Sequence, residues 1–117
     1  MPAEFATPNA VMRTYASPSL TGSPLAVWRA EMAPGAAGPL HSASAEQVIV
    51  VLEGELTASV SGRTTVLGAG DSVVVPADAE RRLANAGAAP VGFLVCSPPA
   101  PTATRGGGEP EPIPWAC

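Results

Sequence analysis

The sequence predicts an all-β domain built from short strands. Fourteen prolines and twelve glycines in 117 residues interrupt the chain too often for long helices. Runs rich in β-branched residues alternate with turn signals every eight to twelve residues or so, which is typical of a sandwich or barrel. The chain is 46% hydrophobic but only 4% aromatic, so valine, leucine, isoleucine and alanine must build the core. We therefore expect a single small domain with one core.

Residues 1–24 are expected to form an N-terminal arm. Pro8, Pro18 and Pro24 punctuate this segment, which leaves one strand candidate at residues 11–15. A strand at the start of a small domain can pair with the sheet of a second copy. The arm is therefore a candidate for strand exchange in a homodimer.

Residues 25–97 hold the expected barrel. Its strands are predicted at residues 25–32, 48–52, 55–60, 64–67, 72–75, 81–86 and 91–97. The continuous apolar run at 48–52 indicates a strand buried on both faces. Glu53-Gly54 and Ser61-Gly62 are expected to be hairpin turns, and residues 68–71 a further turn.

Residues 98–117 are expected to form a flexible or extended tail, because proline and glycine dominate them. Trp115, near the end of this tail, is too apolar to be left in water. We expect it to hold the tail against the barrel or against a partner subunit. The two cysteines, Cys96 and Cys117, do not make a disulfide framework.

Charge and hydropathy exclude several classes of function. The net charge of −4 argues against nucleic-acid binding, which needs a basic surface. No segment approaches the roughly eighteen apolar residues of a membrane span, and the N-terminus lacks the basic and apolar regions of a signal peptide. We expect a cytoplasmic protein with no nucleic-acid or membrane partner.

The only histidine, His41, stands in a recognisable frame. Five residues separate Gly35 from His41, and Ala43 lies two positions further on. Gln47 follows Ala43 after three residues, and Gly54 follows Gln47 after six. This spacing resembles the first motif of the cupins, commonly written G-x5-H-x-H-x(3,4)-E-x6-G.

A second frame begins after fifteen intervening residues. Five residues separate Gly70 from Pro76, and Asp78 occupies the place of a second glycine. Arg81 follows after two residues and Asn85 after three more. This segment resembles the second cupin motif, G-x5-P-x-G-x2-H-x3-N. The resemblance implies a cupin-type jelly-roll β-barrel of two antiparallel sheets.

The same resemblance implies a degenerate metal site. In metal-binding cupins the two histidines and the glutamate of the first motif and the histidine of the second hold a divalent ion. Only His41 remains of these four ligands, since Ala43 has no donor atom and Gln47 offers a neutral carbonyl. Arg81 would place a permanent positive charge where the fourth ligand stood. We therefore expect no metal and no other cofactor.

Two carboxylates flank the lost ligands and could in principle replace them. Glu46 precedes Gln47, and Glu80 precedes Arg81. Adjacent residues of a strand point to opposite faces, so we expect both carboxylates to face solvent.

The resemblance also implies that His41, Gln47 and Arg81 converge inside the barrel mouth. His41 could move a proton near neutral pH, and Arg81 could hold a carboxylate, enolate or phosphate. Gln47 can both donate and accept a hydrogen bond. Residues of matching strand parity are expected to line an apolar pocket around them: Ile49, Val51, Val73, Val75 and Leu83. Trp28 is a further candidate for substrate contact.

Each residue also has a structural interpretation. His41 could be a hydrogen-bonded structural residue, and Gln47 could only satisfy backbone groups. Arg81 could pair at the surface with Glu80 or Glu46, and Trp28 could belong to the core or to a dimer interface. Asp78 is expected to serve turn geometry, because aspartate tolerates such positions.

Three functions are compatible with these residues. The first is a metal-independent isomerase or cyclase of bacterial secondary metabolism that acts on a small, anionic molecule, with His41 as acid or base. The second is a non-catalytic barrel that binds a small molecule. The third is a metal-dependent oxygenase or lyase with a reduced ligand set. A homodimer is expected in each case, because small domains often gain stability by association.

Overall fold

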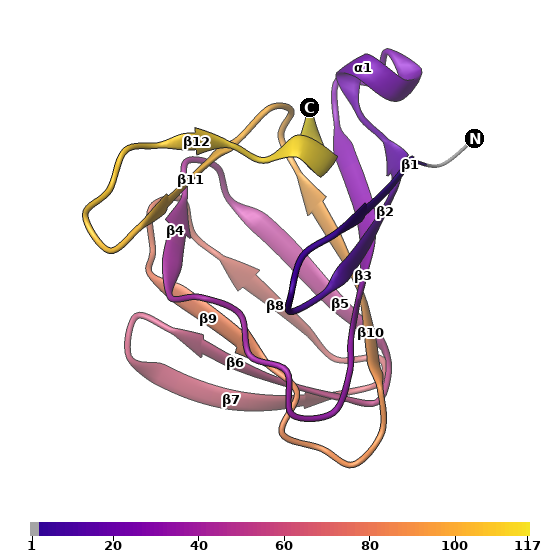
Figure 1. The fold of residues 1–117 in the computed structure, drawn as a ribbon, viewed down its shortest axis with the longest axis vertical. Coiled ribbons are helices and arrows are strands. Elements are labelled where there is room, and N and C mark those ends of the chain that lie inside the picture. The colour runs from indigo at the N-terminus through magenta and orange to yellow at the C-terminus, as the bar shows by residue number, and fades with distance from the viewer. Residues whose placement is uncertain (1–2) are drawn as a thin grey trace.

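Two six-stranded antiparallel sheets face each other in this protein, seen here as a computed structural model that describes residues 3–117 (Figure 1). Strands hold 53% of the residues and helices 6%. The all-β prediction is confirmed, since an ordinary globular domain has about a third of its residues in helices. Among the described residues, no helix has both the length and the apolar character that crossing a bilayer requires.

Sheet A has the strand order β1-β2-β3-β10-β5-β8. Its strands are β1 (Ala3–Ala6), β2 (Val11–Ala16), β3 (Ala26–Met32), β10 (Val91–Ser97), β5 (Gln47–Glu53) and β8 (Ser72–Val75). Sheet B has the order β12-β11-β4-β9-β6-β7. Its strands are β12 (Glu111–Pro112), β11 (Thr102–Arg105), β4 (His41–Ala43), β9 (Arg81–Ala84), β6 (Glu55–Val60) and β7 (Arg63–Gly68). Two short helices, α1 (Pro18–Thr21) and η1 (Pro114–Ala116), lie near the two ends of the chain.

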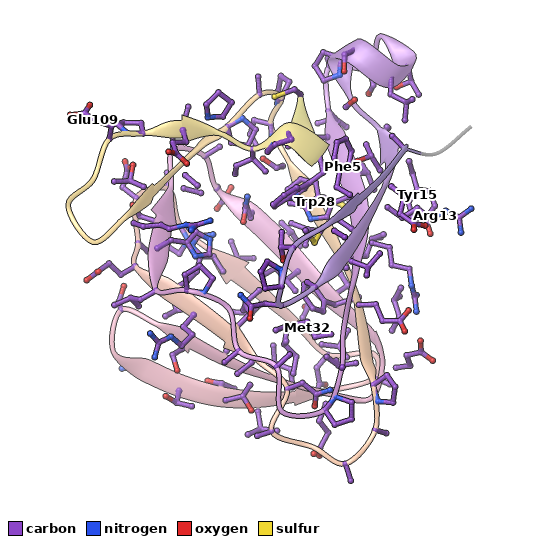
Figure 2. All side chains as sticks on the ribbon, viewed as in Figure 1. Phe5, Arg13, Tyr15, Trp28, Met32 and Glu109 are labelled. Atoms are coloured by element: carbon purple, nitrogen blue, oxygen red, sulfur yellow. The ribbon has the colours of Figure 1, made fainter. Side chains whose placement is uncertain are left out.

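The core lies between the inner faces of the two sheets. Small aliphatic side chains dominate it, as the composition predicts, and methionine and aromatic residues from β2, β3 and β10 complete it. Trp28 and Met32 point inward from β3 (Figure 2). Alternate residues of each strand point into this space. Polar residues at these inward-facing positions therefore also lie inside the barrel.

The prediction that residues 48–52 are buried on both faces is wrong. Their burial alternates along β5: Ile49 and Val51 are buried, whereas Val48 and Leu52 are 36% and 44% exposed. The apolar run therefore supplies one side of the core and one side of an exposed apolar surface. The hydrophobicity of this run could not show which residues face the core and which face solvent, because both faces of β5 carry the same residue types.

The predicted hairpin at Glu53-Gly54 is a corner between the two sheets instead. The strand before it, β5, belongs to sheet A, and the strand after it, β6, belongs to sheet B. Gly54 has φ +75°, and a Cβ atom there would lie 2.4 Å from the carbonyl oxygen of Pro90, so only glycine fits. Ser61-Gly62 does form the predicted hairpin, between β6 and β7, with positive φ at both residues.

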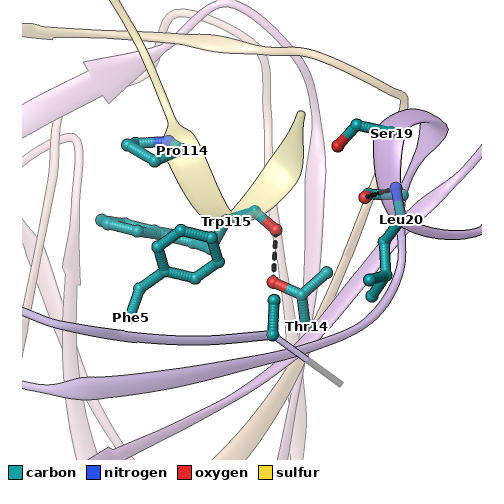
Figure 3. A pocket seen from close by; sticks show the side chains of 8 residues that line it. Phe5, Thr14, Ser19, Leu20, Pro114 and Trp115 are labelled. Atoms are coloured by element: carbon teal, nitrogen blue, oxygen red, sulfur yellow. Dashed lines mark hydrogen bonds between the residues drawn. The ribbon is translucent and has the colours of Figure 1, made fainter. Parts of the chain in front are cut away.

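The two chain ends pack on each other. Trp115 of η1 contacts Phe5 of β1, with 6.3 Å between the ring centroids, and its carbonyl oxygen accepts a hydrogen bond of 2.7 Å from the Thr14 hydroxyl (Figure 3). The Ser19 N–H donates to the Cys117 carbonyl at 2.9 Å. Trp115 thus holds the tail against the protein's own N-terminal arm. That arm pairs with β3 of the same chain through β2, and its exchange between two copies stays a prediction.

Candidate functional site

His41 begins β4, where a glycine-rich loop delivers it to sheet B. The loop runs along β9: the N–H of Gly35 donates to the carbonyl of Asn85 at 2.8 Å, and that of Gly38 donates to the carbonyl of Leu83 at 2.9 Å. Gly35 has φ +83°, a conformation that other residues rarely adopt. The small residues before His41 therefore let the chain follow its neighbour closely before β4 starts.

Two arginines flank His41 in the sheet. Arg81 of β9 is its direct cross-strand partner on one side, and Arg105 of β11 is its partner on the other. Directly opposite residues in antiparallel strands present their side chains on the same face. The imidazole therefore stands between two positive charges.

The hydrogen bond of His41 fixes its tautomer. Nδ1 lies 2.9 Å from the carbonyl oxygen of Pro39. A carbonyl can only accept, so Nδ1 carries the proton and the lone pair of the neutral ring is on Nε2. No other described side chain bonds to Nε2, and every fully buried side-chain nitrogen or oxygen among these residues has a partner, so Nε2 reaches solvent.

The surroundings of His41 favour its neutral form. Burial lowers its pKa below the ordinary value of 6.5. The contact with Pro39 acts in the opposite direction, and repulsion from Arg81 and Arg105 lowers the pKa further. At neutral pH His41 is thus an uncharged imidazole that can accept a proton at Nε2.

Arg81 is buried inside the barrel, with 1% of its surface exposed. Its Nη1 donates to Oε1 of Gln47 at 2.9 Å, Nε donates to the Ala79 carbonyl at 3.3 Å and Nη2 to the Pro76 carbonyl at 3.4 Å. Burial lowers the pKa of Arg81, and the Asp78 carboxylate opposes that shift. Three of its five N–H groups are used by these bonds.

The alternative in which Arg81 pairs with a surface carboxylate is wrong. Glu46 and Glu80 are both exposed, as their strand positions predict, and within residues 3–117 the one ion pair joins Arg29 to Glu53. Arg81 points inward because it occupies one of the alternate positions of β9 whose side chains face the core. Asp78 serves the turn, as predicted, since it has φ +66°.

The residues at the family's ligand positions do not fit a divalent metal. The methyl group of Ala43 is buried and offers no donor, and Oε1 of Gln47 is already taken by Arg81. A guanidinium in this place repels a cation, and a stable site needs three or four donors. No cluster of three His, Cys, Asp or Glu side chains suited to a metal occurs in the described part of the chain.

The structure brings His41, Gln47 and Arg81 together, but it packs the predicted apolar lining into the core. Ile49, Val51 and Trp28 are at most 5% exposed, and Leu83 packs against the same cluster. Two cavities have volumes of about 130 and 340 Å³; of the predicted lining only Val73 borders one of them, the larger. The smaller one lies beside Trp115, between the two chain ends (Figure 3).

Sequence reasoning missed Arg105. It lies in the segment expected to be a flexible or extended tail, and nothing in the local pattern assigns it a partner. Its place beside His41 follows from the pairing of β11 with β4, which joins residues far apart in the sequence. Only the observation that Trp115 must be covered hinted that the tail returns to the barrel.

Comparisons with known proteins agree with this architecture. A family model described as a cupin domain matches residues 28–97. The polyketide cyclase RemF from Streptomyces resistomycificus is similar, with a TM-score of 0.70 and 22% identity, over 78% of this chain and 66% of that one. A sugar phosphate isomerase of the cupin superfamily from Silicibacter pomeroyi gives a TM-score of 0.71 and 21% identity, over 90% of this chain and 75% of that one.

Larger enzymes contain a similar barrel. Oxalate decarboxylase OxdC from Bacillus subtilis gives a TM-score of 0.74 and 19% identity, over 82% of this chain but only 27% of the enzyme. A search of the curated proteins found no match. At these identities the likeness to the solved structures concerns the fold.

The titration of His41 can be measured directly, because the chain has a single imidazole. We expect the Hε1 proton in NMR spectra to report a pKa below 6.5, and Arg105→Gln to raise it because one repulsive charge is removed. As the pH falls below 7, the unfolded chain binds the proton before the folded one does, so the free energy of unfolding should fall. Arg82→Gln, on the outer face of β9, is the control. A pKa above 6.5 that does not respond to Arg105→Gln would contradict this geometry.

Proposed function

The chain belongs to the cupin family, and we propose that it is an enzyme of the isomerase or cyclase type that acts on a small anionic molecule without a metal. The observation that carries this proposal is the position of His41 between Arg81 and Arg105, with Nε2 accessible to solvent. A base next to fixed positive charge suits the removal of a proton from carbon beside a carbonyl group.

The proposed reaction starts when Nε2 of His41 takes a proton from a carbon acid. The electron pair left on carbon moves onto the carbonyl oxygen, which gives an enolate and an imidazolium. The charges of Arg81 and Arg105 stabilise the enolate oxygen. Returning the proton to a different atom completes an isomerisation. Attack of the enolate carbon on a second carbonyl closes a ring instead, and the imidazolium then protonates the alkoxide that this attack leaves.

The charges around His41 also favour an anionic substrate. The guanidinium of Arg81 is held rigidly by Gln47 and two carbonyls, so its charge is already in place before a substrate enters. Such a preorganised charge costs no reorganisation in the transition state. A carboxylate or phosphate on the substrate would be attracted to the same place.

We take the proposed substrate classes from the reactions named for two similar structures. One of these is a polyketide cyclase and another a sugar phosphate isomerase. The small number of reactive side chains here fits a cyclase of bacterial secondary metabolism. Such an enzyme mainly holds a reactive substrate in the right shape, whereas an epimerase needs two acid/base side chains. We place the protein in the cytoplasm, where its two cysteines would stay reduced.

The experiment that tests this function is exchange of carbon-bound hydrogen in D2O. A panel of β-keto acids, aromatic polyketides and sugar phosphates is incubated with the protein and EDTA, and deuterium uptake is followed by mass spectrometry. We expect exchange into at least one class, and His41→Ala should slow it about 100- to 10,000-fold. Loss of one hydrogen bond should lower the free energy of unfolding by only about 0.5–1.5 kcal/mol.

Three results would contradict the proposal. Hydrogen exchange by the His41→Ala variant at the normal rate would show that the histidine has only a structural role. Exchange that EDTA abolishes would indicate a metal enzyme. Tight binding of a panel member without any exchange would favour the non-catalytic barrel. Arg82→Gln, whose side chain faces away from the site, should exchange at the normal rate.

We also propose that the protein is a homodimer that associates through the outer face of sheet A. This face carries several exposed apolar side chains: Tyr15 and Leu52 are 44% exposed and Val74 is 52% exposed. Val74 pairs with Val48, and Val48 pairs with Cys96, so the apolar residues form a continuous row across three strands. A large apolar patch on a small domain is typical of an interface.

Light scattering tests the dimer. We expect a mass about twice the 11.7 kDa of one chain at micromolar concentration. Leu52→Lys should shift the protein toward monomer, because it buries a charge in the interface. Val66→Lys is the matched control, since Val66 is 59% exposed on the outer face of sheet B. A monomer in the unmodified protein, or dissociation caused equally by both substitutions, would refute this interface.

A further inference from the structure

The larger cavity, of about 340 Å³, is bordered by strands of both sheets and lies next to Arg81, on the opposite side of Arg81 from His41. Its lining comes from the β6–β7 hairpin and from β8: Ala58, Val60, Ser61, Arg63, Thr65, Val73 and Val74. The strands β7 and β8 are the last strands of sheets B and A. They do not pair with each other, so sheet edges that no described strand covers border the cavity on two sides.

The floor of this cavity is apolar and its rim is polar. Ala58 is buried, and Val60 and Val73 pack against the core. Arg63 is the cross-strand partner of Val60, and Thr65 is the partner of Ala58, so both side chains lie on the inner face of sheet B. Both are nevertheless exposed.

The edge of β8 adds a main-chain donor. The N–H of Val51 donates to the carbonyl of Asp71, and bonded positions alternate along an antiparallel pair. Val73 and Val75 therefore bond to β5, whereas the main-chain N–H and C=O of Val74 point toward the open edge. This explains how Val74 lines the cavity although its side chain faces the other way.

We propose that this cavity is a binding site for a small carboxylate that carries a short apolar group. The volume lies at the lower end of the range for small-molecule sites. Arg63 forms no ion pair within residues 3–117, and its planar fork suits a carboxylate. The Val74 N–H and the Thr65 hydroxyl are further donors at the rim, and the apolar group would rest on Ala58 and Val60.

The site adjoins Arg81 but shares no lining residue with the His41 cluster. Val60 pairs with Arg81 across β6 and β9, and His41 lies one strand further away. The cavity lining includes none of the three residues of the cluster. Binding here goes beyond the proposed reaction, and it does not depend on the proton chemistry of His41.

Titration with phenylacetate and its neutral analogue phenylacetamide, followed by NMR, tests this site. We expect phenylacetate to bind more tightly than phenylacetamide and to shift the amide signals of residues 58–65 and 73–74. Arg63→Gln should weaken phenylacetate binding about tenfold and leave phenylacetamide unaffected. Thr65→Trp should block both ligands, because the indole would fill the cavity.

Matched controls make the outcome decisive. Thr64→Trp places the same indole on the opposite face of β7 and should leave binding unchanged, as should Arg82→Gln. His41→Ala should also bind phenylacetate normally, whatever it does to deuterium exchange. Equal affinity for the two ligands, or loss of binding in His41→Ala but not in Arg63→Gln, would overturn the site. Shifts at the edges of β7 and β8 with an extended peptide but not with phenylacetate would also overturn it.

Discussion

The buried guanidinium of Arg81 determines what this barrel can hold. A charge with 1% of its surface exposed must be satisfied by hydrogen bonds, and Gln47 and two carbonyls of the loop after β8 provide them. The loop is itself tied to β4, because the Asp78 N–H donates to the Ala43 carbonyl at 2.8 Å. Arg81 therefore links both sheets and the loop, at the motif position where the resemblance implies a metal-binding histidine.

His41 acquires its properties from the same arrangement. Its neighbours in the sheet are Arg81 and Arg105, and together with burial they keep the imidazole neutral. Pro39 fixes the proton on Nδ1, which leaves Nε2 as the acceptor. The histidine at a motif position that the resemblance assigns to a metal ligand is thus a candidate base between two positive charges. The positive charges of Arg81 and Arg105 are expected to favour a negatively charged substrate and to keep His41 ready to accept a proton.

The sequence predicted the parts that depend on local pattern and on motif spacing. The strand at Val91–Ser97 has the predicted bounds, and Asp78 and Ser61-Gly62 adopt the predicted turns. What could not be predicted depends on pairing between distant segments. A Glu-Gly turn signal is the same for a hairpin and for a corner between sheets, so Gly54 was assigned to a hairpin. Arg105 beside His41 follows only from the return of the tail to β4.

Titration with Mn²⁺ tests the central claim most directly, with calorimetry on the unmodified protein and on a variant that carries Ala43→His, Gln47→Glu and Arg81→His. If the guanidinium excludes cations from the barrel, the unmodified protein should bind no Mn²⁺, whereas the variant, which regains four donors, should bind one ion per chain. Binding of one ion per chain by the unmodified protein, lost in His41→Ala, would contradict the claim.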